Sequence, residues 1–323
     1  MKKYLVTGVA GFIGSALVRA LIQHGDQVRG LDDFSTGKPE NIAGLESHLD
    51  FRESSLLDAA ALAGACQGVD CIFHQAAIPS VPKSMAEPQL TNSVNVEGTL
   101  NLLMAARDAG VKRVVYAASS SAYGESEALP KHEDMVPRPI SPYAVQKLTG
   151  EHYMGVFAKV YGVETVSLRY FNIFGPRQDA NSQYSAVLAK FITLMLQGQS
   201  PTIYGNGEQS RDFTFIDNAV HANLLAAAAP AAEVSGKVFN VATGKRFSLN
   251  QIYQMLQEII GFSGAVQYAP ARAGDVMHSL ADISQAQKHL GYSPLVDFQE
   301  GLKRTVDWYR EKAQAATPAV LTR

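Results

Sequence analysis

Three glycines, spaced three residues apart, constrain how this chain begins to fold. The apolar run Tyr4–Thr7 leads directly into Gly8-Val-Ala-Gly11-Phe-Ile-Gly14, and helical periodicity continues over Phe12–His24. The first glycine permits a tight turn after a strand, the second lets backbone approach a ligand, and the third lets the helix pack on the strand. We therefore predict a strand, a glycine turn and a helix whose first turn faces an anion.

Strand-like and helix-like segments alternate through the first half of the chain, which predicts an α/β fold with a parallel sheet covered by helices on both faces. The expected strands are Tyr4–Thr7, Gln27–Asp32, Leu49–Glu53, Cys71–Gln75, Arg113–Ala118 and Glu164–Arg169. The expected helices are Phe12–His24, Ala59–Ala65, Asn92–Ala109 and Tyr143–Tyr161. We infer a Rossmann-type doubly wound parallel sheet over residues 1–172.

After Phe174 the pattern changes. Helical stretches at Ser185–Leu196, Asp217–Ala229 and Gln251–Ile260 are separated by short apolar runs and loops, which predicts a smaller carboxy-terminal α/β lobe over residues 173–313 that binds substrate. Residues 211–217 look like a strand segment that returns toward the large domain, so the boundary need not be one clean cut. Residues 314–323 lack periodicity and are expected to fray.

Composition argues against several classes of protein. The 323 residues carry a formal net charge of -2 and no run of lysine and arginine, so nucleic-acid and membrane-surface binding have no support. No signal peptide and no apolar run of membrane-spanning length is visible, which favours a cytoplasmic protein. Cys66 and Cys71 fit neither a disulfide framework nor a zinc pattern, and no two histidines have metal-ligand spacing, so we predict no metal.

An acidic residue ends the second predicted strand. Asp32 lies roughly twenty residues beyond the glycine turn, where a carboxylate accepts both ribose hydroxyls of a dinucleotide. Its charge repels a 2′-phosphate, so NAD is preferred over NADP. In the turn that follows, Lys38 and the hydroxyls of Ser35 and Thr36 would soften that preference.

A second motif adds the chemistry. Tyr143 and Lys147 are four residues apart and share a helix face, so an ammonium can lie near a phenol. The cation would lower the pKa of Tyr143 from its usual ~10 and make it a general base near neutral pH. A hydroxyl from the run Ser119-Ser120-Ser121, at a strand end, would hydrogen-bond the same substrate oxygen. Together with the glycine turn, these residues predict an oxidoreductase site.

With these motifs, His74-Gln-Ala-Ala77, Arg169-Tyr-Phe-Asn172 and Arg211-Asp-Phe resemble the extended short-chain dehydrogenase/reductase family over nearly the whole chain. Within it, the chain is most similar to the nucleotide-sugar 4-epimerases, above all those acting on UDP-N-acetylglucosamine. The resemblance implies a bound NAD that accepts a hydride from sugar C4 and returns it to the opposite face. It also implies a homodimer formed through the helices at 92–109 and 143–161.

The resemblance assigns a role to each matching position. The implied catalytic residues are Ser119, Ser121, Tyr143 and Lys147, of which Tyr143 would take the O4 proton and Lys147 would bind the nicotinamide ribose. Implied cofactor contacts are Gly8, Gly11, Phe12, Ile13, Gly14, Asp32, Asp33, Phe34, Ser35, Thr36, Gly37, Ser55, Leu56, Gln75, Ala76, Ala77, Tyr143, Lys147 and Tyr170. Implied UDP-sugar contacts are Ser80, Ser119, Ser121, Tyr143, Asn172, Ala186, Val187, Thr202, Ile203, Tyr204, Arg211, Arg272, Asp275 and Ser279.

Two arginines and one serine define the implied substrate. Arg211 and Arg272 would bind the diphosphate as bidentate partners, with Asp275 facing the uridine ribose. Ser279 matches a gate position that is a bulky tyrosine in epimerases restricted to UDP-glucose and UDP-galactose. Because serine leaves room for an acetamido group, the resemblance implies interconversion of UDP-N-acetylglucosamine and UDP-N-acetylgalactosamine, with the non-acetylated pair also accepted. Pro79, where galactose-type enzymes carry a lysine, fits this branch.

Two other functions fit parts of the sequence. A nucleotide-sugar dehydratase, or a UDP-glucuronate epimerase or decarboxylase, would share the fold, NAD and the tyrosine–lysine pair. Dehydratases typically place an Asp-Glu pair where this chain has Ser120 and Ser121, which argues against that chemistry. A non-enzymatic NAD-binding sensor is the second alternative, since a fold does not fix a function. We expect His74 to be a hydrogen-bonded core residue rather than a catalytic one.

Overall fold

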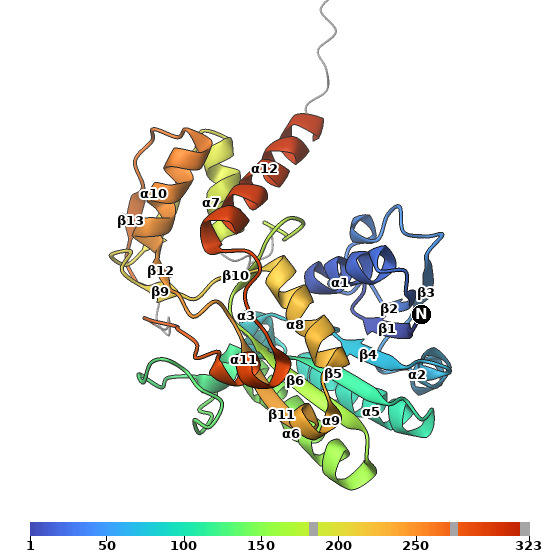
Figure 1. Cartoon of the computed structure of the whole chain (residues 1–323). Helices are drawn as coiled ribbons and strands as arrows, with labels where there is room; N and C mark the ends of the chain where they lie inside the picture. The colour runs from blue at the N-terminus through green and yellow to red at the C-terminus, as the bar shows by residue number, and fades with distance from the viewer. Residues whose placement is uncertain (181–186, 272–276, 317–323) are drawn as a thin grey trace, which may run out of the picture.

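A seven-stranded parallel sheet forms the centre of the part of the chain that the structure describes, residues 1–180, 187–271 and 277–316 (Figure 1). The structure is a computed structural model. The strands of this sheet are β1 (Lys3–Thr7), β2 (Gln27–Asp32), β3 (Leu49–Glu53), β4 (Cys71–His74), β5 (Arg113–Ser119), β6 (Glu164–Tyr170) and β11 (Lys237–Val241). Their order is β11-β6-β5-β4-β1-β2-β3, and every neighbouring pair is parallel. The predicted doubly wound fold is confirmed.

Helices cover both faces of the sheet, as the alternating pattern predicted (Figure 1). One face carries α1 (Phe12–Gln23), α8 (Ile216–Ala228) and α11 (Ser284–Leu290), and the other carries α2 (Ala59–Cys66), α5 (Gly98–Asp108) and α6 (Pro142–Tyr161). Successive side chains of β1 point to opposite faces, so Tyr4 and Val6 pack in one core and Leu5 in the other. Burial on both faces explains why the central strands are apolar throughout.

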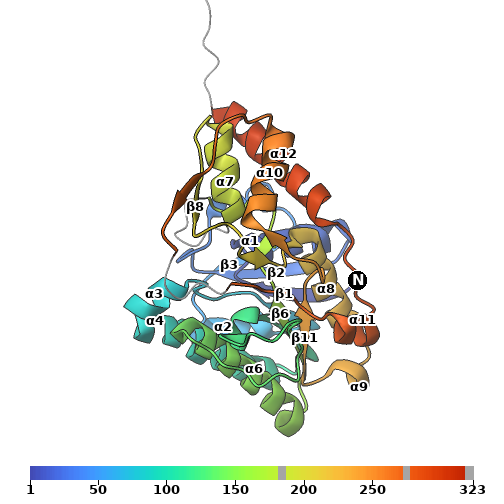
Figure 2. The same cartoon turned by 90° about the vertical axis from the view of Figure 1, so that its left-hand side faces the viewer.

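A second group of elements forms a lobe beside the carboxyl ends of the strands (Figure 2). It contains α7 (Val187–Leu196), α10 (Leu249–Ile260) and α12 (Phe298–Ala316), with short strand pairs between them. The pairs are β7 (Ile173–Phe174) with β10 (Thr214–Phe215), β8 (Thr202–Tyr204) with β13 (Gln267–Ala269), and β9 (Ser210–Arg211) with β12 (Phe247–Ser248). Phe174, Phe213 and Phe298 lie at the centre of its own hydrophobic core.

The structure differs from the sequence predictions in four places. Residues 211–217, expected as one strand segment, instead contain parts of β9, β10 and the start of α8. The helix expected at 92–109 is instead α4 (Pro88–Asn92), one π-helical turn η2 (Ser93–Glu97) and α5. β11, which falls in the range assigned to the lobe, is an edge strand of the large sheet because it pairs with β6, and α8 and α11 also pack on that sheet. α12 extends to Ala316, so the tail predicted from 314 begins inside a helix; residues 317–323 lie outside the described residues.

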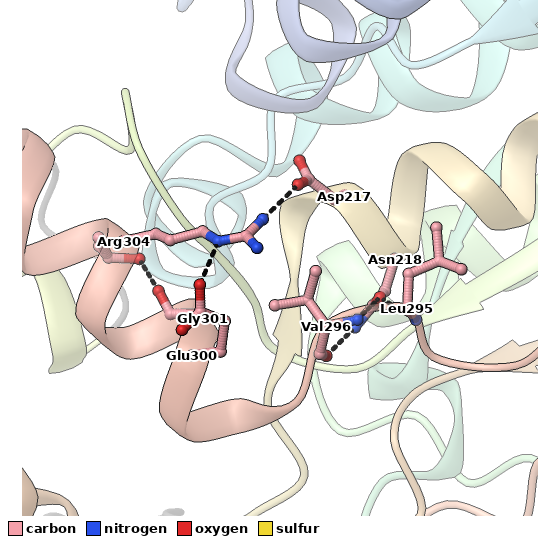
Figure 3. Close-up of polar contacts among 8 residues, drawn as sticks. Asp217, Asn218, Leu295, Val296, Glu300, Gly301 and Arg304 are labelled. Atoms are coloured by element: carbon pink, nitrogen blue, oxygen red, sulfur yellow. Dashed lines mark hydrogen bonds and ion pairs between the residues drawn. The ribbon is translucent and has the colours of Figure 1, made fainter.

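Buried polar contacts join α8 to the segment before α12. The Asn218 side chain accepts hydrogen bonds from the backbone of Leu295 and Val296 at 2.7 and 2.9 Å and donates to the Val296 carbonyl at 2.7 Å (Figure 3). Beside it, Arg304 of α12 pairs with Asp217 at the start of α8. These hydrogen bonds and this ion pair therefore connect the lobe to α8, one of the helices that cover the large sheet. Among the described residues, no helix is both long and apolar enough to cross a membrane.

Candidate active site

The glycine turn after β1 leaves no room for side chains. Gly8 has a φ of +69°, and a Cβ atom there would lie 2.7 Å from the Ala76 nitrogen. A Cβ on Gly14 would lie 2.1 Å from the Gly8 carbonyl oxygen, so the start of α1 packs directly on the turn. Gly11 is the N-cap of α1. Because the glycines have no side chains, a ligand can approach the backbone at the first turn of α1. A pyrophosphate is suited to this position, since backbone N–H groups and the helix dipole both favour an anion there.

A cavity of about 900 Å³ lies between this turn and the lobe. Its wall includes most of the residues predicted to contact the cofactor, namely Gly8, Gly11, Phe12, Ile13, Gly14, Asp32, Asp33, Ser35, Thr36, Leu56, Gln75, Ala76, Ala77, Tyr143, Lys147 and Tyr170. Three others are not part of the wall. The Phe34 ring packs on Phe51, Gly37 packs against the Asp32 carboxylate, and Ser54 lines the cavity in place of Ser55.

Asp32 shapes the loop that follows β2. One carboxylate oxygen accepts from the Ala10 amide at 2.8 Å and the other from the Phe34 amide at 2.9 Å. Burial raises the pKa of Asp32, and these two backbone hydrogen bonds oppose that shift. Lys38, which the sequence suggested as a cation near the ribose, forms an ion pair with Asp179 at 2.9 Å. Its charge is therefore partly neutralised at the end of the cavity where Asp32 lies.

Tyr143 and two serines form a connected group at the opposite end. Ser141 caps α6 and accepts from the Ala144 amide, which places Tyr143 in the first helical turn. The Ser119 side chain lowers the pKa of Tyr143 against the larger effect of burial, and Ser121 Oγ donates to Ser119 Oγ at 2.8 Å. Ser119 is thus the member of the serine run that acts on the tyrosine, while Ser121 is linked to it only through Ser119.

Lys147 behaves differently from the sequence expectation. Its ammonium donates to the Ala117 carbonyl at 2.9 Å and lies over the ring of Tyr116, 5.0 Å from the ring centre. Burial lowers the pKa of Lys147 to about 7 and raises the pKa of Tyr143 to about 12. The expected lowering of the tyrosine pKa by this lysine is therefore wrong for the protein alone, because desolvation disfavours both charged forms.

The predicted substrate contacts divide into three groups. Ser80 and Tyr143 line the cavity. Asn172, Val187, Thr202, Ile203, Tyr204, Arg211 and Ser279 lie outside the cavity wall, on lobe segments or on the connection into the lobe. Ser119, at the end of β5, and Ser121, just after it, also lie outside the cavity wall. Arg211 donates to the carbonyl groups of Ser210 and Met277, and the Ser279 amide donates to the Ser210 carbonyl. Ala186, Arg272 and Asp275 lie outside the described residues.

His74 is a buried structural residue. Its two ring nitrogens bond the hydroxyls of Thr7 and Thr99 at 2.8 and 2.9 Å, and burial lowers the pKa of His74 to about 3. It is therefore neutral in the folded protein, as a core histidine should be. No group of three potential metal ligands occurs within the described ranges.

Several buried polar residues around the site had no recognisable pattern in the sequence. Asn223 of α8 donates to the Tyr170 hydroxyl at 2.7 Å and accepts from Gln75, so it orients two residues of the cavity wall. The Ser84 hydroxyl accepts from the Tyr143 amide at 3.0 Å. Each contact joins segments 50 or more positions apart, and no spacing rule along the chain reports such contacts.

Comparison with known proteins places this arrangement in context. The model of the NAD-dependent epimerase/dehydratase family matches residues 4–242. A UDP-glucose 4-epimerase of Mycolicibacterium smegmatis is 38% identical over 96% of this chain and 99% of its own length. Two solved structures are similar throughout: the UDP-N-acetylglucosamine 4-epimerase of Methanobrevibacter ruminantium in complex with UDP-N-acetylmuramic acid (41% identity, TM-score 0.92), and the UDP-glucuronic acid 4-epimerase of Bacillus cereus in complex with UDP-glucuronic acid and NAD (34%, TM-score 0.88). Each alignment covers 96% of this chain and 99% of the other.

Proposed function

Because the chain belongs to the NAD-dependent epimerase/dehydratase family, with NAD as its cofactor, we propose that it is a UDP-hexose 4-epimerase that interconverts UDP-N-acetylglucosamine and UDP-N-acetylgalactosamine. UDP-glucose and UDP-galactose are also accepted. The observation that carries the proposal is a cavity whose wall holds Tyr143 and Lys147 at one end, next to Ser119, and the glycine turn Gly8–Gly14 at the other.

The residues that line the cavity fit a bound dinucleotide. A Cβ atom on Gly8 or Gly14 would collide with backbone, so the glycine turn allows close approach of a ligand. Asp32 ends β2 and lines the cavity, where a carboxylate can accept from the adenosine ribose. NAD bound there supplies a carrier for the C4 hydride and a positive charge on its oxidised ring. We assign the pyrophosphate to the first turn of α1.

The chain's own residues handle the proton. With a pKa of about 12, the Tyr143 phenol is ionised in only about one molecule in 10⁵ at pH 7. A cation near the phenol oxygen must therefore stabilise the phenolate while the proton moves from O4 to Tyr143. Ser119, whose side chain acts on the Tyr143 phenol, supplies a hydroxyl to the same oxygen. Lys147, with a pKa of about 7, is charged in roughly half of the molecules at neutral pH and binds the ribose beside the tyrosine.

The distribution of acidic groups supports epimerisation over dehydration. Among the described residues of the cavity wall, the acids are Asp32, Asp33, Glu40 and Asp179, and none of them belongs to a segment that carries Tyr143 or Ser119. Elimination of water from a sugar needs an acid and a base beside the tyrosine, in addition to the hydride carrier. Ser120 and Ser121 stand where such a pair would be needed. A 4-keto sugar formed here is therefore reduced again rather than dehydrated.

Exposed apolar side chains support a homodimer. Leu90, Met104, Val145, Val156 and Val160, on α4, α5 and α6, are all at least 39% exposed and face away from the sheet core. Apolar residues gathered on neighbouring helices of one face are typical of a protein interface. We propose that two copies pair through this face, with α5 and α6 of each copy in contact across a two-fold axis.

One experiment tests the function. Purified protein is mixed with UDP-N-acetylglucosamine, UDP-glucose and UDP-glucuronate without added cofactor, and the products are separated by chromatography. The C4 epimer of the first two should form without accumulation of reduced NAD, and Tyr143→Phe should lower turnover by at least ~10²-fold while NAD stays bound. Near-normal turnover by that variant would refute the assignment of Tyr143 as the base. A pentose or a keto-sugar as the end product would instead indicate a decarboxylase or dehydratase.

A further inference from the structure

A buried glutamine lies between the two catalytic residues of α6. Gln146 follows Tyr143 by three positions, precedes Lys147 directly and is 3% exposed. Its side-chain oxygen accepts from Asn95 Nδ2 at 2.8 Å, and its nitrogen donates to the Thr91 hydroxyl at 3.0 Å. Both partners are buried as well. Gln146 does not line the cavity, so it acts on the site only through the residues it holds.

Asn95 connects this glutamine to the cavity wall. Its side-chain oxygen accepts from the Ile78 amide at 2.7 Å and its nitrogen donates to the Ile78 carbonyl at 3.2 Å, so it holds both backbone polar groups of that residue. Ile78 lies in the segment Gln75–Ser80, which lines the cavity. Asn95 is in the middle of the π-helical turn η2, a widened turn of a kind that often occurs at functional sites.

Thr91 connects the same glutamine to α4. Its hydroxyl also donates to the carbonyl groups of Glu87 and Pro88, so it has acceptors of its own within the helix. The adjacent Leu90 belongs to the exposed apolar face that we assign to the dimer. A single side chain of α6 therefore joins the wall of the cavity and the helix at the proposed interface.

We propose that Gln146 is a positioning residue, which fixes the first turns of α6 against the cavity wall so that Tyr143 and Lys147 keep one position relative to the sugar. The inference rests on the proposed function, since Tyr143 must be the base. Fully satisfied polar networks in a low-dielectric interior are stiff and hold one geometry. Loss of the Gln146 amide would free α6 from η2, and a misplacement of a catalytic group by about 1 Å can cost ~10²-fold in rate.

Gln146→Met is the test, because methionine keeps the length and volume of the side chain but has no amide. The partners keep other acceptors, the Ile78 carbonyl for Asn95 and the Glu87 and Pro88 carbonyls for Thr91, so the variant should fold. We expect kcat to fall about 10- to 100-fold. KM for the UDP-sugar should change little, and the pH profile of kcat should shift, because the surroundings of Tyr143 and Lys147 change together.

Asn218→Ala is the matched control. Asn218 is also a fully buried amide that holds backbone groups of another segment, but it lies at the seam between α8 and α12 (Figure 3). The control should lower the unfolding temperature and leave the pH profile of kcat unchanged. Thr91→Val allows a double-mutant cycle. It should lower kcat in the wild-type background and cause no further fall in kcat in the Gln146→Met background. A Gln146→Met enzyme with wild-type kcat and pH profile would overturn the inference.

Hydrogen exchange separates this inference from the proposed function. If the wild-type protein epimerises no UDP-sugar, the proposed function fails, yet the contact can still be measured. The Ile78 amide should exchange faster in Gln146→Met, whereas in Asn218→Ala the faster amides should be those of Leu295 and Val296. Unchanged protection of Ile78 in the glutamine variant would refute the inference whatever the protein acts on.

Discussion

Glu151→Gln should destabilise this protein strongly, because it removes one charge of a buried ion pair. Glu151 lies one turn after Lys147 on α6 and binds Arg169 of β6 through two hydrogen bonds, of 2.9 and 2.7 Å. The two side chains are 3% and 4% exposed. Burial disfavours the Arg169 cation, but the bonds to Glu151 raise the pKa of Arg169, so the arginine stays charged.

The expected loss of stability depends on the partners that Arg169 would keep without the Glu151 carboxylate. Its guanidinium lies over the Tyr123 ring, and one of its terminal nitrogens has no hydrogen-bond partner in the described part of the chain. Removing one partner of a buried pair leaves an uncompensated charge and typically costs about 3–5 kcal/mol. Glu164→Gln is the matched control, because Arg113 would retain the carbonyl groups of Ala226, Ala227 and Ala229. A loss of about 2 kcal/mol or less is expected there.

Urea unfolding of both variants, followed by circular dichroism in one buffer, measures the difference. Glu151→Gln should show the lower midpoint at an unchanged slope of unfolding free energy against urea. Equal midpoints, or the lower midpoint in Glu164→Gln, would refute the reasoning that the acceptors left to each arginine decide the cost.

Four further outcomes follow from the structure. Gly14→Ala forces a Cβ to 2.1 Å from the Gly8 carbonyl, so the variant should purify without NAD, as absorbance of the denatured supernatant would report. Ser279→Tyr should suppress activity on the acetylated pair and spare UDP-galactose; equal loss on both excludes it as the gate. Val156→Glu should convert a dimer mass to a monomer mass, and a monomeric wild type contradicts the proposed interface. The Lys147 pKa is about 7 folded against 10.5 unfolded, so the unfolded chain binds more protons between these values, and stability without cofactor should rise with pH there; an equal rise in Lys147→Met would refute this.

The sequence predicted most of the large sheet because its strands are short, apolar and bounded by turn residues. Nine of the ten strands and helices predicted in the first half agree with the structure within one residue at each end. Gln27–Asp32 and Leu49–Glu53 agree to the residue, and the helix predicted at Ala59–Ala65 ends at Cys66. β11 was not predicted, because nothing in the sequence around this five-residue run indicates that it pairs with β6. The π-helical turn was not predicted, because one widened turn hardly alters the helical periodicity of the sequence.

The candidate site was predictable where its chemistry has a fixed spacing along the chain. Gly8, Gly11 and Gly14 form one turn, and Asp32 ends the next strand, so the positions of these residues follow from local structure. Contacts such as those of Gln146 join elements that meet only in the folded molecule, and their residue types are common on any helix. Such residues carry no pattern that could distinguish them from solvated ones before the packing of α6 on η2 is known.

The ionisation of Tyr143 shows where spacing alone misleads. A separation of four residues places Lys147 and Tyr143 on one helix face, and in water that proximity would favour the phenolate. In the fold both groups are buried, and burial is the largest cause of both shifts, so the pKa of Tyr143 rises and that of Lys147 falls. A lysine with a pKa of about 7 is a weaker source of positive charge at neutral pH than a solvated one. If Tyr143 is the base, as we propose, a further positive charge such as that of oxidised NAD has to lie near the phenol, and proton transfer then depends on an occupied cofactor site.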